Sequence, residues 1–207
     1  MRITVYCDGS CEPTNPGGYG CSAFVAFEGN FSGAAGRFRP RPLVEKYTCI
    51  GHGDGMTNNV SEYHAVIGAL RWLLAEHRDA EIVVRTDSQL VVRQVNGEWA
   101  CNKEHLRGMR DEARELIEQF ECLELEWVRR EENDVADALT RRAYAEATGR
   151  KVGERTKEEL MSRRPPTEKQ LNYLYNLGCR IVPTNMAQAS QLIDEYLKKR
   201  ERKYGNV

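Results

Sequence analysis

Residues 1–10 read MRITVYCDGS, and this stretch decides the fold class. Apolar side chains alternate with others from Ile3 to Cys7, which is the period-2 pattern of a strand with one buried face. The Asp8-Gly9 pair that follows is typical of a turn. The sequence therefore predicts that the chain opens with a strand that ends at a carboxylate.

Working outward from this stretch, apolar periodicity predicts eight further elements. Alternating or compact apolar runs predict strands, whereas apolar residues that recur every three or four positions predict amphipathic helices. The strands are expected at about 21–29, 43–50, 81–87 and 122–128, and the helices at about 60–77, 88–95, 103–120 and 133–147. Elements in this order predict an α/β fold, in which helices flank the faces of a mixed sheet.

A second, smaller part is predicted at the C-terminus. Residues 149–164 are polar and charged and lead into a Pro-Pro pair, which predicts a linker. Residues 165–203 predict a small module of two helices, and residues 1–148 the main domain. The first helix of the module is expected to turn three leucines inward, namely Leu171, Leu174 and Leu177.

The charge is distributed unevenly between these parts. The whole chain has 30 Lys and Arg against 31 Asp and Glu. Residues 151–207 hold 12 basic and 7 acidic side chains, whereas residues 1–150 hold 18 and 24. A basic tail on an acidic body fits a tail that contacts a polyanion, but solvated helices with spare lysines look the same. Both interpretations stay open.

Composition limits the class of protein. Of the 207 residues, 41% are hydrophobic and 29% are charged, and no apolar run approaches the ~18 residues that would predict a membrane span. The seven cysteines include no CxxC pair, which argues against a zinc ribbon. The N-terminus shows no signal or transit pattern. We therefore expect a cytoplasmic monomer with reduced thiols and no membrane partner.

Four carboxylates lie at positions where α/β proteins often carry functional groups. Asp8 and Asp87 each follow a predicted strand, and groups at strand ends converge on a crevice where ligands bind. Glu62 lies on the apolar stripe of the first predicted helix, where an ionised carboxylate is costly unless it is paired or metal-bound. Asp137 lies one turn into the last helix of the main domain.

Each of these acids also has a purely structural interpretation. The aspartates could begin a turn or stabilise a helix dipole, and Glu62 could turn back on Asn59 in a capping box. Together, however, the four carboxylates would repel each other unless cations relieved the repulsion. Oxygen-only ligands favour Mg²⁺ or Mn²⁺ over Zn²⁺, and two such ions activate water in phosphodiester hydrolysis.

Four blocks of sequence, in this order, resemble the motifs of the type 1 ribonuclease H family. They are YCDGSCEPTNPGGYG (6–20), TNNVSEYHAVIGAL (57–70), RTDSQLVV (85–92) and WVRREENDVADALTRRA (127–143). The resemblance covers about residues 1–147. It implies a five-stranded mixed sheet with flanking helices. It also implies endonucleolytic cleavage of the RNA strand of RNA–DNA hybrids with two Mg²⁺ ions, leaving 5′-phosphate and 3′-hydroxyl ends.

The resemblance also implies a role for each carboxylate. Asp8 would bridge both metal ions. Glu62 and Asp87 would hold the ion next to the attacking water, and Asp137 would hold the other ion or its water shell.

The same resemblance implies contacts to the hybrid. Asn15, Asn58 and Gln89 would touch the hybrid and its 2′-hydroxyls, since an amide suits a group that both donates and accepts hydrogen bonds. Trp99 and Lys103 would contact the DNA strand.

The sequence departs from the family pattern before the last helix and after Asp87. Many members carry a flexible His-bearing loop, but here only Val128 to Glu132 precede Asn133, and all four histidines lie at or before position 105. The segment after Asp87 is also too short and too acidic for the basic protrusion with which some members hold DNA. The first loop carries one extra residue before Asn15. Acids that could take over part of the histidine's role are Glu131, Glu132 and Asp134.

The missing protrusion gives the basic tail a candidate role. The module weakly resembles helical modules attached to other nucleic-acid enzymes, and its basic side chains could add phosphate contacts, which would make hybrid affinity salt-dependent. Docking to a protein partner is the alternative. The basic residues concerned are Arg163, Arg164, Lys169, Lys198, Lys199 and Arg200.

Two other functions stay open. The first is another nuclease of the same fold, such as a resolvase or an integrase, because a fold does not fix the substrate. The Asp-Gly-Ser and Thr-Asn-Asn blocks argue against it. The second is a non-catalytic hybrid-binding protein, for which we would expect an incomplete set of acids.

Overall fold

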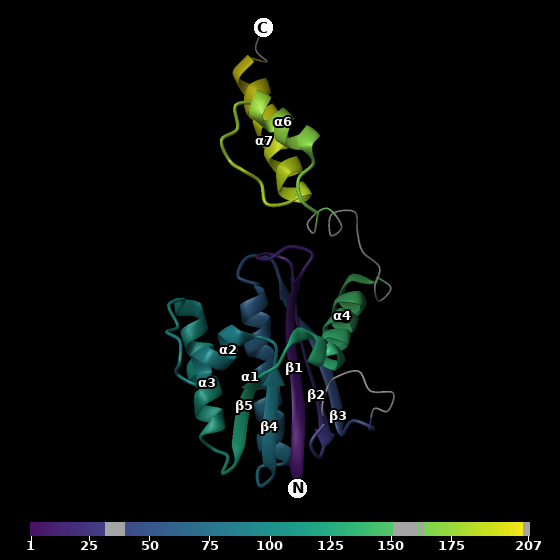
Figure 1. Ribbon diagram of the computed structural model, residues 1–207, viewed down its shortest axis with the longest axis vertical. Coiled ribbons are helices and arrows are strands. Elements are labelled where there is room, and N and C mark those ends of the chain that lie inside the picture. The colour runs from purple at the N-terminus through teal and green to yellow at the C-terminus, as the bar shows by residue number, and fades with distance from the viewer. Residues whose placement is uncertain (32–39, 151–160, 162–163, 205–207) are drawn as a thin grey trace. The chain divides into compact units, whose positions relative to one another are not determined.

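The computed structural model divides the chain into two compact units, Met1–Gly153 and Glu154–Val207 (Figure 1). It describes residues 1–31, 40–150, 161 and 164–204, with side chains described to residue 199. Each unit is treated by itself below. The predicted linker falls largely outside the described residues, so the predicted domain boundaries stay a prediction.

The first unit contains a five-stranded mixed sheet, as the sequence predicts. The strand order is β3-β2-β1-β4-β5. The β1–β2 and β2–β3 pairs are antiparallel, whereas β1–β4 and β4–β5 are parallel. The strands are β1 (Arg2–Glu12), β2 (Tyr19–Glu28), β3 (Val44–His52), β4 (Glu81–Thr86) and β5 (Leu123–Trp127).

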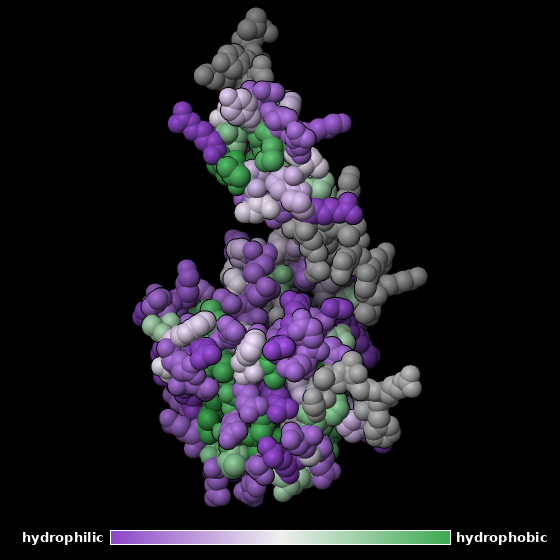
Figure 2. All heavy atoms as spheres, in the orientation of Figure 1, coloured by the Kyte–Doolittle hydropathy of each residue, from purple (hydrophilic) through white to green (hydrophobic). Residues whose placement is uncertain are grey.

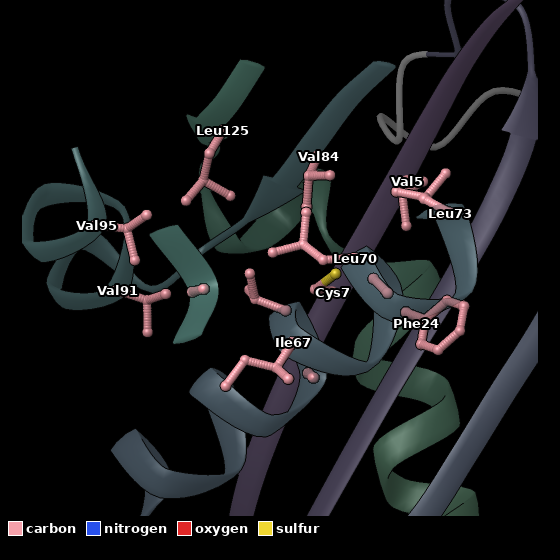
Figure 3. Close-up of a cluster of buried hydrophobic side chains, with 14 of the residues drawn as sticks. Val5, Cys7, Phe24, Ile67, Leu70, Leu73, Val84, Val91, Val95 and Leu125 are labelled. Carbon is pink, nitrogen blue, oxygen red and sulfur yellow. The ribbon is translucent and has the colours of Figure 1, made fainter. Parts of the chain in front are cut away.

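Helices cover both faces of this sheet (Figure 1). Because strand side chains alternate, Val5 and Cys7 of β1 face the core that α1 covers, whereas Tyr6 faces the core that α4 covers. Figure 3 shows the larger core, in which side chains of β1, β2, β4, β5, α1 and α2 point toward one another. The helices of this unit are α1 (Asn58–Glu76), α2 (Gln89–Val95), α3 (Glu104–Ile117), the 3₁₀ turn η1 (Arg130–Glu132) and α4 (Asp134–Thr148).

The predicted end of the first strand was wrong. β1 continues past Asp8 to Glu12, because its antiparallel pairing with β2 runs on to Glu12 and Tyr19. Its parallel pairing with β4 stops earlier, at Cys7 and Thr86. Asp8 is therefore the first residue of β1 beyond β4, and the carboxylate lies at the end of the parallel pairing rather than at the end of a strand.

The start of the first helix also differs from the prediction. Thr57 is the N-cap of α1, and its side chain accepts a hydrogen bond from the backbone N–H of Val60. The helix therefore begins at Asn58, two residues before the predicted start. A threonine cap satisfies one of the free N–H groups at the helix end, which explains the earlier start.

The second unit contains α6 (Glu168–Asn176) and α7 (Met186–Tyr204). Its small core is formed by Leu174, Ala189 and Leu192. The expectation that Leu171 faces inward was wrong, since this side chain is 40% exposed. α6 packs against α7, and its buried residue is Leu174, so the buried stripe of α6 is narrow. Figure 2 shows hydrophobic residues at the surface of this unit among hydrophilic ones.

No helix in the described part of the chain is long and apolar enough to cross a membrane.

Candidate active site

A close backbone contact brings Asp8 next to Glu62. Gly9 of β1 lies against the first turn of α1. A Cβ atom added at Gly9 would be 2.1 Å from the backbone nitrogen of Glu62 and 2.2 Å from the carbonyl carbon of Ser61. Only glycine allows this approach, so the strand and the helix meet at the position where each carries an acid.

Asp8 is buried and has one short hydrogen bond. The residue is 7% exposed, and Oγ1 of Thr140 on α4 donates to its Oδ2 at 2.6 Å. Burial raises the pKa of Asp8 to about 7. The Thr140 hydrogen bond opposes this rise, and the neighbouring acids Asp87, Asp137 and Glu62 add to it. The charge on Asp8 is therefore costly in the isolated protein.

Glu62 contacts Ser88, the N-cap of α2. The hydroxyl of Ser88 donates to Oε2 of Glu62. Burial raises the pKa of Glu62 to about 7, while the Ser88 hydrogen bond lowers it and the charge of Asp87 raises it. The capping-box interpretation was therefore wrong, because Glu62 turns toward α2 rather than back toward Asn59 in its own first turn.

Asp87 follows β4 and is held by Asn133. The Asn133 side chain is fully buried, and its Nδ2 donates to the carbonyl oxygen of Cys7 at 2.9 Å and to Oδ1 of Asp87 at 3.1 Å. One amide thus links the middle of β1 and the residue that follows β4 to the start of α4. The indole N–H of Trp127 donates to the carbonyl oxygen of Asp87 at 3.1 Å and fixes the backbone there.

Asp137 lies on the first turn of α4 between two arginines. Arg130 of η1 approaches its Oδ1 to 3.3 Å, and Arg141 pairs with its Oδ2 one turn further along α4. Partial loss of hydration lowers the pKa of Arg130, yet the charges of three neighbouring aspartates outweigh this and raise it. Arg130 is therefore a fixed positive charge beside the acids, although 73% of its side chain is exposed.

The four predicted carboxylates thus form one cluster of interacting charges. They come from β1, α1, the end of β4 and α4. In the described part of the chain, no three His, Cys, Asp or Glu side chains are arranged to enclose a metal ion. Each carboxylate instead accepts hydrogen bonds from neighbouring donors, which are Thr140, Ser88, Asn133, Arg130 and Arg141.

The chemistry of the cluster nevertheless suits a divalent cation. All its ligand atoms would be carboxylate oxygens, which hard cations prefer. Buried charges of like sign repel each other, and a cation bound among them lowers this repulsion most directly. The residues present therefore fit a divalent metal ion.

Two of the predicted substrate-contacting residues are linked by one hydrogen bond, and the second of them also binds β1. Oδ1 of Asn15 accepts from the backbone N–H of Asn58 at 3.1 Å, and Oδ1 of Asn58 accepts from the backbone N–H of Cys11 at 2.7 Å. These bonds tie the end of β1 and the loop that follows it to the start of α1. Both amides therefore have structural partners next to the carboxylate cluster.

The other three predicted substrate-contacting residues are solvent-exposed. Gln89 is the first residue of α2 and lies two positions after Asp87. Trp99 is 48% exposed in the segment between α2 and α3, and Lys103 is the N-cap of α3.

Sequence reasoning missed the donors that hold the acids. Thr140 and Arg130 were not singled out, although Thr140 follows Asp137 by one turn of the same helix. Asn133 was recognised only as a cap. Of the acids suggested as replacements for a loop histidine, Glu132 accepts from the backbone N–H of Arg129 at 3.2 Å and so stabilises η1.

The chain is similar to several known proteins. A family model described as reverse transcriptase-like matches residues 44–143. The chain is 42% identical over 129 residues to ribonuclease HI of Halobacterium salinarum, an alignment that covers 56% of this chain and 63% of that protein.

Solved structures are similar as well. The crystal structure of RNase H1 from Halobacterium salinarum NRC-1 is 32% identical, has a TM-score of 0.58 and covers 70% of this chain and 99% of its own. LC11-RNase H1 in complex with an RNA/DNA hybrid is 29% identical, has a TM-score of 0.59 and covers 70% of this chain and 99% of its own.

The chain spans 63% and 42% of the length of the first curated relatives that it matches.

Proposed function

Because the chain belongs to the type 1 ribonuclease H family, we propose that it is an endonuclease that hydrolyses the RNA strand of RNA–DNA hybrids. The observation that carries this proposal is the cluster of four acids from four separate elements, with the pKa of Asp8 and of Glu62 raised to about 7. Perturbed acids gathered in one place are typical of a catalytic site.

The proposed catalytic and metal-binding residues are Asp8, Glu62, Asp87 and Asp137. Asp8 is the most buried of them and lies next to the other three, so it is suited to contact both ions of a pair. Glu62 and Asp87 would hold one side of the site and Asp137 the other. Mg²⁺ is the proposed cofactor, with Mn²⁺ as a substitute and two ions per site. Such ions lower the pKa of a bound water and stabilise the leaving 3′-oxygen.

Three amide side chains and two other exposed side chains of the first unit are the proposed substrate contacts. Asn15, Asn58 and Gln89 are suited to the 2′-hydroxyl, which is the group that distinguishes RNA from DNA. Trp99 and Lys103 would contact the DNA strand, the first by stacking and the second through phosphate.

A labelled hybrid tests the proposed activity. The full-length protein should cut the RNA strand in Mg²⁺ or Mn²⁺ and leave 5′-phosphate and 3′-hydroxyl ends. Asp8→Asn and Asp87→Asn should each abolish cleavage while hybrid binding survives. Cleavage that persists in both variants would refute the assignment of the acids. A four-way junction cut in preference to the hybrid would favour a resolvase instead.

The second unit is proposed to add phosphate contacts to the hybrid. Its described basic side chains are solvent-exposed, and the unit adds positive charge to an acidic catalytic unit. Two of the basic residues expected to contribute, Arg163 and Arg200, lie outside the residues whose side chains are described. The exposed basic side chains of the unit include Arg164, Lys169, Lys198 and Lys199.

Salt dependence tests this role of the second unit. Charge reversal at Lys169, Lys198 and Lys199 should weaken hybrid affinity and reduce the slope of log K against log salt by about 2 to 3, since each lost phosphate contact removes about one counter-ion. A matched variant with Lys46 of β3 reversed should leave the slope nearly unchanged. An unaltered slope in the triple variant would favour docking to a protein partner.

A further inference from the structure

Thr140 makes a hydrogen bond across the fold that its own helix does not require. It lies on α4 three residues after Asp137 and is 1% exposed. A threonine in a helix can satisfy its hydroxyl on a carbonyl one turn earlier, and the Asp137 carbonyl oxygen is 3.0 Å from Thr140 Oγ1. Yet the shorter contact, at 2.6 Å, is to Oδ2 of Asp8, which is 132 positions away in the sequence.

This contact fixes the one part of Asp8 that the sheet leaves free. The backbone of Asp8 is held by its pairing with Ala23 of β2. Its carboxylate still turns about two side-chain bonds, and a short hydrogen bond at one oxygen selects an orientation. Among the described residues, Thr140 donates a side-chain hydrogen bond to this carboxylate. The hydroxyl therefore determines how the buried acid faces its neighbours.

The attachment of α4 to the sheet does not depend on this bond. Val135, Ala136 and Leu139 already pack α4 against the sheet. Asn133 adds a hydrogen bond to the carbonyl oxygen of Cys7 at 2.9 Å. A further bond to the tip of a carboxylate adds little to that docking, whereas it acts directly on the functional group.

We propose that Thr140 is a positioning residue whose hydroxyl holds the Asp8 carboxylate in the orientation in which it binds a divalent cation together with the neighbouring acids. This rests on the proposed function, because it takes the acid cluster to be a cation site. Hydrogen-bond partners of metal ligands typically change metal affinity by 10–100-fold. Loss of the hydroxyl should therefore weaken cation binding by about tenfold, with little change in the fold.

Mn²⁺ binding to the full-length protein tests the proposal without any need for catalysis. Free Mn²⁺ is measured by electron paramagnetic resonance for the wild type, Thr140→Val and Thr140→Ser. Valine keeps the shape and loses the donor, so its dissociation constant should rise about tenfold. Serine keeps the donor and should stay within about threefold of the wild type. An unchanged constant for Thr140→Val, with the fold intact by circular dichroism, would overturn the positioning role.

Two further variants, Asp8→Asn and Thr140→Ala, separate a failure of the positioning role from a failure of the cation site. Asp8→Asn is titrated in parallel: if it binds Mn²⁺ like the wild type, the cation site itself is wrong and the proposed function loses its support. If Asp8→Asn loses binding but Thr140→Val does not, only the positioning role is wrong. Should Thr140→Val fail to fold, Thr140→Ala and Thr140→Ser differ by one hydroxyl oxygen. The same tenfold difference is then expected between them.

Discussion

Asp8 and Glu62 are acids that the fold holds in an unfavourable environment. Burial raises the pKa of Asp8 from 3.8, and that of Glu62 from 4.5, to about 7. A folded-state pKa above the unfolded value means that the folded protein binds the proton more tightly. The two protonated carboxyls therefore contribute their full share to the free energy of unfolding at low pH. This contribution is lost as the pH rises through about 7. Without a cation the site therefore costs the fold stability at neutral pH.

Asp8→Asn should raise stability even though it abolishes activity. Asparagine keeps an acceptor for Thr140 and removes the buried charge, so in EDTA at pH 7.5 we expect Tm to rise by about 4 °C or more. The gain should shrink at pH 5, where the wild-type carboxyl is largely protonated. Calorimetry at both pH values checks this, and an equal gain at both would contradict it.

Arg130 should compete with the cation for the acids. Because its guanidinium lies beside Asp137 and interacts with Asp8 and Asp87, Arg130→Ala should tighten Mn²⁺ binding about threefold in low salt. The difference should fade as salt screens this exposed charge. Arg2→Ala, which removes the same charge at the opposite end of β1, is the control and should bind Mn²⁺ like the wild type. Weaker binding by Arg130→Ala would contradict the expectation.

At the scale of elements, the approach of β1 to α1 decides how near the acids lie. Gly9 allows the two backbones to meet where Asp8 and Glu62 stand. α4 completes the site from the other face of the sheet, since it supplies Asp137 and the donors Asn133 and Thr140. The site therefore depends on the packing of two helices on one strand.

Gly9→Ala should damage both the fold and the site. Its Cβ would overlap backbone atoms that cannot move aside, so we expect a loss of about 3 kcal/mol or more and a marked loss of cleavage. Gly108→Ala is the matched control: nothing lies within 4 Å of a Cβ at this exposed position of α3. It should raise stability by about 0.5–1 kcal/mol with cleavage unchanged. Thermal unfolding and hybrid cleavage measure both effects.

At the scale of the whole molecule, the described hydrophobic cores are separate. Three of them consist of residues of the first unit and one consists of residues of the second. All four proposed catalytic acids belong to the first unit. A substitution in the core of the second unit should therefore change neither the thermal stability of the first unit nor its catalytic activity.

Leu174→Ala should unfold the second unit alone. Leu174 is 2% exposed in a core of few residues, and the loss of about 2–5 kcal/mol exceeds what so small a unit can withstand. Helix content should fall while the main Tm and the cleavage of a short hybrid stay unchanged. Leu70→Ala, in the main core, should instead lower the main Tm by about 5–15 °C. A main Tm lowered equally by both substitutions would contradict the division.

The sequence by itself determined the elements of the first unit and the identity of the four acids. Alternation and helical periodicity report on neighbours two to four residues apart, which is enough to predict the strands and helices and, from their order, a mixed sheet. The resemblance to the family implies that this sheet has five strands, and the structure confirms it. Asp8, Asp87 and Glu62 stood out because they follow predicted strands or interrupt an apolar stripe, whereas Asp137 stood out because its block resembles a motif of the family. The metal-binding roles of the acids stay predictions, as do the substrate-contacting roles of Asn15, Asn58, Gln89, Trp99 and Lys103.

Only the tertiary structure decided what holds those acids. That Asp8 lies inside β1, that Glu62 turns toward Ser88, and that Thr140 donates to Asp8 all depend on how distant segments pack. Local patterns carry no information about a contact between residues 132 positions apart. Such a contact follows from the burial of apolar surface on both faces of the sheet, which brings α1 and α4 to the same end of β1.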